Sequence, residues 1–171
     1  MRRGGVLRRH LVRDLLSRAL DRNKKKLPIL VVYDSDLTGK NIREYFQGKS
    51  QLIYVSLGYS CPMNRLYQEI LFQLAPHENP QQFKNHKRGV VEVCEKIRQS
   101  EKKIIVIDNC QHLVIMRLFY LLGLLFELDG LVQFIFIIEG RYYARWNQTS
   151  GINKLRVEFF ISHFKKKILL N

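Results

Sequence analysis

Four continuous runs of apolar residues recur along the chain. Runs of this kind, rich in β-branched side chains, are typical of strands that are buried on both faces of a sheet. A fifth run alternates less cleanly but is also rich in strand-forming residues. The predicted strands are Leu27 to Tyr33, Gln51 to Leu57, Lys103 to Asp108, Leu131 to Ile138 and Arg156 to Ser162.

Segments with apolar residues at helical spacing lie between these strands. We expect helices at Ile42 to Gln47, Leu66 to Leu74, Phe83 to Ser100 and Leu113 to Leu128. Because parallel neighbours need crossover connections, strands that alternate with helices predict an α/β fold with three layers and a mostly parallel sheet. Ligands of such sheets bind beyond the carboxyl ends of the strands, so the loops after the first, third and fourth strands are of most interest.

The length of 171 residues predicts a single domain. We place it at residues 27–164, between a basic N-terminal segment of residues 1–26 and a short tail of residues 165–171. In the N-terminal segment, apolar residues at every fourth position predict an amphipathic helix that packs on the domain; they are Leu7, Leu11, Leu15 and Ala19. An organellar transit peptide and a nucleic-acid contact remain alternative interpretations of this segment.

Charge narrows the range of partners. The chain has 29 Lys and Arg against 15 Asp and Glu, a formal net charge of +14, and a positive field of this size attracts polyanions, nucleic acid first among them. Acidic protein or lipid surfaces stay open as alternatives. The three cysteines are scattered singly, which favours a reducing, cytoplasmic setting. Because Arg117 and Glu127 interrupt the longest apolar stretch, we expect no membrane span.

The loop after the first predicted strand carries a candidate phosphate site. Asp34 to Asn41 aligns with the pattern G-x-x-x-x-G-K-[ST], in which backbone N–H groups and a lysine bind phosphates. Thr38, Gly39 and Lys40 fit that pattern. Asp34 stands at the position of the first glycine, and Asn41 stands where a hydroxyl would bind magnesium, so the site is partly eroded. A Gly-Lys pair in a polar turn is also common by chance.

The third predicted strand ends in Asp108. P-loop NTPases hold magnesium through an acid at the carboxyl end of such a strand. The next residue, where many of these ATPases have a glutamate that activates water, is Asn109. Because an amide cannot act as a base, this position predicts weak or no hydrolysis. A polar strand end or a helix cap is the alternative interpretation of Asp108.

These segments together resemble the AAA+ ATPases of the transposition regulators related to TnsC, TniB and the Mu B protein. The matching pieces are Asp34 to Asn41, Leu52 to Leu57, Cys61 to Leu71 and Lys103 to Leu113. The resemblance implies ATP and Mg²⁺ as ligands, assembly into rings or filaments, and contact with DNA and transposition proteins. It also implies that Arg156 is offered to the nucleotide of a neighbouring subunit. The resemblance covers no complete helical lid after Phe164.

The sequence therefore supports hypotheses of different classes. The first is an ATP-binding, AAA+-like regulator that acts on DNA. The second is a nucleotide-free interaction module that keeps the fold and binds nucleic acid or protein, and the third is a decayed copy of a transposon ATPase. A further segment interleaves basic and aromatic side chains, either as a stacking surface for nucleic acid or as core and loop residues; it contains Tyr142, Tyr143, Arg145 and Trp146.

Overall fold

The computed structural model describes residues 3–21, 26–47, 49–78, 85–113, 115–164 and 166–170. The strands are β1 (Ile29–Tyr33), β2 (Ile53–Ser56), β3 (Ile104–Asp108), β4 (Gln133–Glu139) and β5 (Lys166–Leu170). The α-helices are α1 (Arg3–Asp21), α2 (Asp36–Gln47), α3 (Met63–Leu74), α4 (His86–Gln99), α5 (Leu118–Glu127), α6 (Gly140–Asn147) and α7 (Gly151–Ser162). Two short 3-10 turns, Cys110–His112 and Ile115–Arg117, join β3 to α5.

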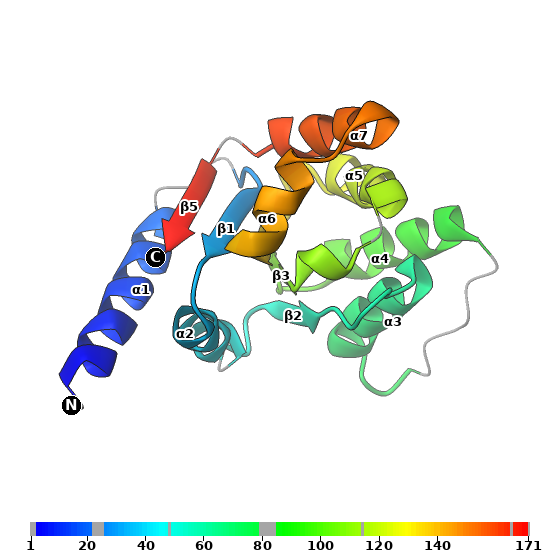
Figure 1. Ribbon diagram of the computed structural model, residues 1–171. Coiled ribbons are helices and arrows are strands. Elements are labelled where there is room, and N and C mark those ends of the chain that lie inside the picture. The colour runs from blue at the N-terminus through cyan, green and yellow to red at the C-terminus, as the bar shows by residue number, and fades with distance from the viewer. Residues whose placement is uncertain are drawn as a thin grey trace.

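The strands form one parallel sheet in the order β2-β3-β4-β1-β5 (Figure 1). The predicted α/β fold with a parallel sheet is therefore confirmed. Because β1 precedes β2 in the chain but lies three strands away, the β1-to-β2 crossover runs opposite to the others. The right-handed rule for crossovers then places its helix, α2, on the other face from the helices between the later strands.

Two apolar cores result, one on each face of the sheet. Alternate residues of β1 divide between them, with Leu30 and Val32 on one face and Ile29, Val31 and Tyr33 on the other. The larger core receives α3, α4, α5, α6 and α7, and the smaller core receives α1 and α2. The chain thus has the expected three layers.

The last strand is not where the sequence predicted it. Residues 156–162 belong to α7, and the edge strand β5 comes instead from the segment that we assigned to a tail. Val157 and Phe160, three positions apart, are the buried residues of α7, which is the spacing of a helix and not of a strand. The β-branched and aromatic residues of this segment misled the prediction, because packing on α5 decides its conformation.

The N-terminal helix is confirmed, but its buried face differs from the predicted stripe. Val12, Leu16 and Ala19 are buried, whereas Leu11 is 59% exposed and Leu15 is 37% exposed. The side chain of Leu7 and the predicted helix start at Phe83 lie outside the described residues. None of the helices in the described part of the chain is long and apolar enough to cross a bilayer.

A side chain closes one edge of the sheet. The Gln73 amide accepts a hydrogen bond from the Tyr54 backbone N–H at 2.9 Å and donates to the Tyr54 carbonyl at 2.6 Å. At Tyr54 it therefore pairs with β2 as a neighbouring strand would, and it satisfies two edge groups that could otherwise pair with another chain.

Candidate functional site at the carboxyl edge of the sheet

The carboxyl ends of the strands bring most of the predicted site residues to one edge. Asp34 follows β1, Asp108 ends β3, and the register pairs Tyr33 with Glu139 and Ser56 with Asp108. The start of α2, with Lys40, follows directly after Asp34. The structure therefore places Lys40 and Asp108 at the same sheet edge, as the sequence predicted, and the environment of each residue decides what this edge can bind.

The predicted phosphate-binding loop is not formed. Only Asp34 and Ser35 separate β1 from α2, which begins at Asp36. Ser35 caps this helix: its Oγ accepts from the Thr38 N–H at 3.2 Å, and its carbonyl accepts from the Gly39 N–H at 2.9 Å. Two of the N–H groups expected to bind phosphate are therefore used within the chain.

Gly39 and its neighbours serve packing at this position. A Cβ on Gly39 would lie 2.5 Å from Cε2 of the Tyr33 ring, so the absence of a side chain lets α2 approach β1. The Lys40 side chain is 71% exposed, with its Nζ 4.0 Å from Oε1 of Glu44 on the next turn. Asn41 is buried, and its Nδ2 has no hydrogen-bond partner among the described residues.

Asp34 lies where an anion would be expected. Its carboxylate reaches the first residue of α6, Gly140, so closely that a Cβ on Gly140 would collide with Oδ1 of Asp34. A negative charge at a helix N-terminus interacts favourably with the helix dipole. The Asp34 carboxylate thus lies at the N-terminus of α6.

Asp108 is fully buried, and protein groups already engage both of its oxygens. Oδ2 accepts from the Tyr54 hydroxyl at 2.6 Å and lies 3.7 Å from Nη1 of Arg43. Oδ1 accepts from the Asn109 N–H at 2.7 Å. The exposed fraction of the Asp108 side chain is 0%. A buried carboxylate needs such partners, because an unpaired one would cost several kcal/mol, on the order of the penalty for a buried ion.

The ionisation of the neighbouring tyrosines fits this arrangement. Burial, followed by the charge of Asp108, raises the pKa of Tyr54 far above its usual value, so its hydroxyl stays protonated and donates to Asp108. Burial also raises the pKa of Tyr33, while the Arg43 guanidinium acts in the opposite direction. Tyr33, Arg43 and Tyr54 thus surround the carboxylate that the sequence assigned to magnesium.

These residues do not fit a bound magnesium ion. Mg²⁺ takes carboxylate oxygens together with several waters, whereas Asp108 has no exposed surface and an arginine cation beside it. No group of three His, Cys, Asp or Glu side chains among the described residues could hold a metal ion.

Asn109 has a structural role at the turn after β3. Its backbone is left-handed, with φ of 58° and ψ of 42°, a conformation that asparagine tolerates better than most residues. Its Nδ2 donates to Oγ of Ser56 at 3.0 Å, which ties this turn to the end of β2. The position that would hold a catalytic glutamate in an ATPase therefore joins two strand ends.

Arg156 was predicted to lie at the start of the last strand, but the structure places it within helix α7. There its Nη1 donates to Oδ1 of Asn153 at 3.3 Å and its guanidinium lies 5.9 Å from the centre of the Phe119 ring. Its place in the chain thus offers no support for a role at a neighbour's nucleotide.

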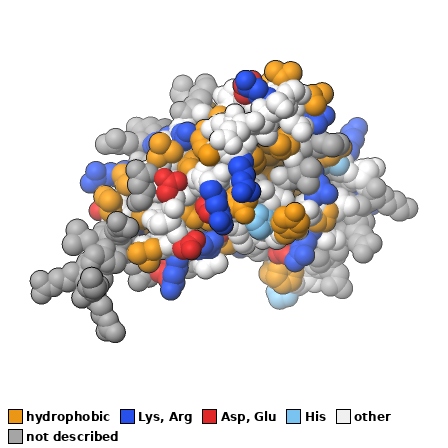
Figure 2. Space-filling model, in the orientation of Figure 1, with side chains coloured by type: hydrophobic (Ala, Val, Ile, Leu, Met, Phe, Trp, Pro, Cys, Tyr) orange, Lys and Arg blue, Asp and Glu red, His pale blue; other side chains and the backbone are white. Residues whose placement is uncertain are grey.

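Basic and aromatic side chains gather on α6 and β5. We call this set the α6 surface; it consists of Arg141, Tyr142, Tyr143, Arg145 and Lys167. The guanidinium groups of Arg141 and Arg145 lie 5.0 and 5.4 Å from the centre of the Tyr142 ring. Nζ of Lys167 lies 4.1 Å from the centre of the Tyr143 ring and donates to its hydroxyl at 2.9 Å. Figure 2 shows Lys and Arg side chains over α6.

Not every cation or aromatic group near the α6 surface is available to a partner. Arg141 forms an ion pair with Glu139, whereas Arg145 and Lys167 are exposed. Trp146 is only 6% exposed and lies edge-on to Phe160 in the core, so the structure removes it from the predicted stacking surface.

Sequence reasoning missed the residues that close the site. Arg43 lies one helical turn beyond Lys40 in α2, and Tyr54 lies in β2. Neither residue belongs to a nucleotide-binding pattern. Only the prediction that β2 and β3 are neighbours could have placed Tyr54 beside Asp108. No protein-family model matches this chain, and no curated protein is significantly similar to it.

Proposed function

We propose that this protein is a nucleotide-free interaction module that keeps the three-layer fold of a P-loop NTPase-like domain and binds nucleic acid. The observation that carries the proposal is the environment of Asp108, whose carboxylate is fully buried and bound by Tyr54 and Arg43. The acid that resembles a magnesium ligand is thus bonded to other groups of the chain at this sheet edge.

Nucleotide binding at this edge would need several costly changes. The first turn of α2 would have to unwind to free the Thr38 and Gly39 N–H groups from Ser35. Arg43 and Tyr54 would have to leave Asp108, and Asp34 would repel the incoming phosphates. Each change breaks an interaction of about 1 kcal/mol or more, and the ionic one costs more than that.

Nucleic acid is the partner that the charge favours. Ten of the 29 Lys and Arg residues lie within residues 1–26, which contain only two acidic residues. Helix α1 of this segment lies on the β5 side of the sheet (Figure 1), where Nζ of Lys166 donates to the Ala19 carbonyl at 3.3 Å. Arg13 and Arg18 of α1 are exposed. These arginines lie on one face of the sheet and the α6 surface lies on the other, on either side of the edge strand β5. We call the two sets together the basic flank, and we propose that a phosphate backbone runs across it.

Binding of nucleic acid by this flank can be tested by salt titration. We expect a labelled oligonucleotide to bind with an affinity that falls linearly with salt on a double logarithmic scale, because phosphate contacts release counterions. The paired changes Arg145→Ala and Lys167→Ala should reduce the slope by about 2, one for each lost contact. The measurement is fluorescence anisotropy between 50 and 200 mM salt, roughly the range over which such complexes weaken.

A matched control removes the same charge elsewhere. Arg88 and Lys96 lie on α4, which packs against α3 and α5. The changes Arg88→Ala and Lys96→Ala should leave the slope unchanged. Equal losses in both double variants, or no binding at the lowest salt concentration, would contradict a nucleic-acid site on this flank.

The second candidate is an ATP-binding, AAA+-like regulator of the transposition type, which would also act on DNA and assemble with copies of itself. Two observations favour it: the sheet places β4 between β1 and β3, and Lys40 and Asp108 share one edge. This order agrees with the AAA+ resemblance. The candidate requires the rearrangements of Thr38, Gly39, Arg43 and Tyr54 described above.

A further inference from the structure

Helix α7 has apolar side chains on two faces. Val157 and Phe160 are buried in the core. Three other apolar residues recur at helical spacing on the outward face and stay exposed: Ile152 by 64%, Leu155 by 65% and Phe159 by 48%. Figure 2 shows hydrophobic side chains at the top of the molecule, over α7. A helix with apolar residues all round is usually buried on every side, so the outward face of α7 is suited to a partner.

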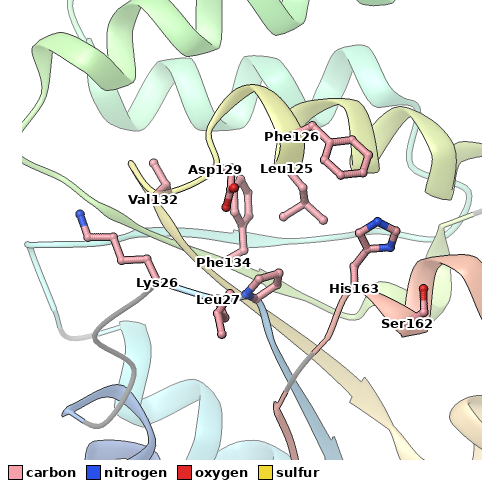
Figure 3. Close-up of a pocket in the computed structure, with 10 residues that line it drawn as sticks. Lys26, Leu27, Leu125, Phe126, Asp129, Val132, Phe134, Ser162 and His163 are labelled. Carbon is pink, nitrogen blue, oxygen red and sulfur yellow. The ribbon is translucent and has the colours of Figure 1, made fainter.

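Aromatic residues of α5 extend this outward face. Phe119 is 44% exposed, and its ring stacks on that of Phe159 with the ring centres 5.9 Å apart. The His163 ring meets the rings of Phe159 and Phe126 at centre distances of 4.9 and 5.1 Å, and Figure 3 shows Phe126 and His163 next to each other. Phe126 is itself 58% exposed.

The exposed residues form one continuous surface across two helices. We call it the α7 patch; it consists of Phe119, Phe126, Ile152, Leu155 and Phe159. Contiguous apolar patches on a protein surface mark contacts with other proteins, whereas single exposed apolar residues need no explanation. The groups that border the patch then indicate which partner it fits.

A pair of opposite charges borders the α7 patch. Nζ of Lys154 lies 3.8 Å from Oε1 of Glu158 on the next helical turn, and both side chains are exposed. The two residues form a row along α7 beside the apolar stripe. Such a row is complementary to its own copy when the copy runs in the opposite direction, because Lys154 then faces Glu158 of the partner subunit and the reverse pair forms as well.

The apolar residues fit the same antiparallel arrangement. When two α7 helices cross with residues 155 and 156 at the centre, Leu155 faces Leu155 of the partner subunit. In that register Ile152 faces Phe159 of the partner subunit, so each end of the stripe also meets an apolar group. A two-fold axis requires every contact to occur twice, and one register meets this condition for the apolar and the charged positions together.

We propose that the α7 patch binds a second copy of this chain, with the two α7 helices antiparallel about a two-fold axis. This contact uses the same patch on both subunits, whereas rings and filaments join two different patches. The dimer is therefore distinct from the assembly that the AAA+ resemblance implies, and it does not depend on the binding of nucleic acid. Because α7 has 12 residues and is about 18 Å long, the interface is small and we expect a dissociation constant in the micromolar range.

Sedimentation equilibrium from low micromolar to submillimolar protein tests the dimer. The unchanged chain should shift from monomer to dimer over this range, and Leu155→Glu should weaken the association at least about a hundredfold, because it places two carboxylates at the apolar centre of the interface. Val91→Glu is the matched control, since Val91 is 48% exposed on α4 outside the patch, and it should leave the association unchanged. A monomer at every concentration, or an equal loss in both variants, would overturn the proposal. Thermal melting checks that each variant is folded.

Charge reversal tests the antiparallel register. Lys154→Glu and Glu158→Lys each give the border a single sign, so each variant alone should dimerise about tenfold more weakly. The chain with both changes exchanges the two charges and should dimerise like the unchanged chain. An equimolar mixture of the two single variants should also regain the association, although neither variant regains its own pair within α7. Single changes without effect, or a mixture as weak as its components, would contradict this interface.

Discussion

Replacing Asp108 by alanine is expected to lower the free energy of unfolding by about 3 kcal/mol. The change leaves the Arg43 guanidinium without its carboxylate and the Tyr54 hydroxyl and the Asn109 N–H without their acceptor. The estimate is at the lower end of the range for buried ion pairs, because the Arg43 side chain is 33% exposed and water can solvate it in part. Urea unfolding monitored by circular dichroism measures the effect.

Lys40→Ala is the matched control for this prediction. The Lys40 side chain is exposed and its ion pair with Glu44 is long, so its loss should change stability by less than about 0.5 kcal/mol. When a residue is held in a strained position for a ligand, replacing that residue often stabilises the ligand-free protein. If Asp108→Ala proved neutral or stabilising, the carboxylate would be strained and reserved for a ligand, and the nucleotide-free account would be wrong.

Replacing Phe160 by alanine is expected to cost about 3–5 kcal/mol, the range for large aromatic residues in a core. Phe160 has no exposed surface, and the centres of the Phe136, Trp146 and Phe164 rings lie 5.6, 6.1 and 5.0 Å from its own. Phe159→Ala removes the same ring from a side chain that is 48% exposed, and it should cost much less. Thermal or urea unfolding of both variants checks this contrast.

Two further alanine variants distinguish a helix from a strand at residues 156–162. In α7, Val157 and Phe160 are buried and Glu158 is exposed, so Val157→Ala should destabilise the protein and Glu158→Ala should not. A strand would place residues 158 and 160 on one face and would reverse this order. Destabilisation by Glu158→Ala without an effect of Val157→Ala would restore the strand that the sequence first predicted.

The central strands of the sheet could be predicted from the sequence because they are almost entirely apolar. β1, β3 and β4 are buried on both faces, so each is a short continuous apolar run rich in β-branched residues, which favours a strand. The edge strand β5 carries two lysines in five residues and is exposed at alternate positions. Such a strand resembles a polar tail, and only its pairing with β1 identifies it.

The candidate site could be located from the sequence, but whether its groups are free to bind a ligand could not be predicted. The rule that ligands bind beyond the carboxyl ends of parallel strands placed Lys40 and Asp108 at one edge. Whether a ligand can bind at that edge depends on three other residues. Ser35 caps α2 by accepting from the Thr38 N–H, and Arg43 and Tyr54 contact Asp108 from other elements of the fold. A Ser35 that caps α2 and a Ser35 in a phosphate loop have the same sequence around them, so the pattern alone could not distinguish the two.

Thermal unfolding with and without magnesium and ATP tests the central claim most directly. A ligand that binds only the folded state increases the free energy of unfolding, by about 2.7 kcal/mol when its concentration is a hundred times its Kd. The melting temperature rises as a result. With Asp108 bound by Tyr54 and Arg43, and with the Thr38 and Gly39 N–H groups bound to Ser35, we predict no rise at millimolar ATP and magnesium. A magnesium-dependent rise that Lys40→Ala abolishes would contradict the account and establish the ATP-binding alternative.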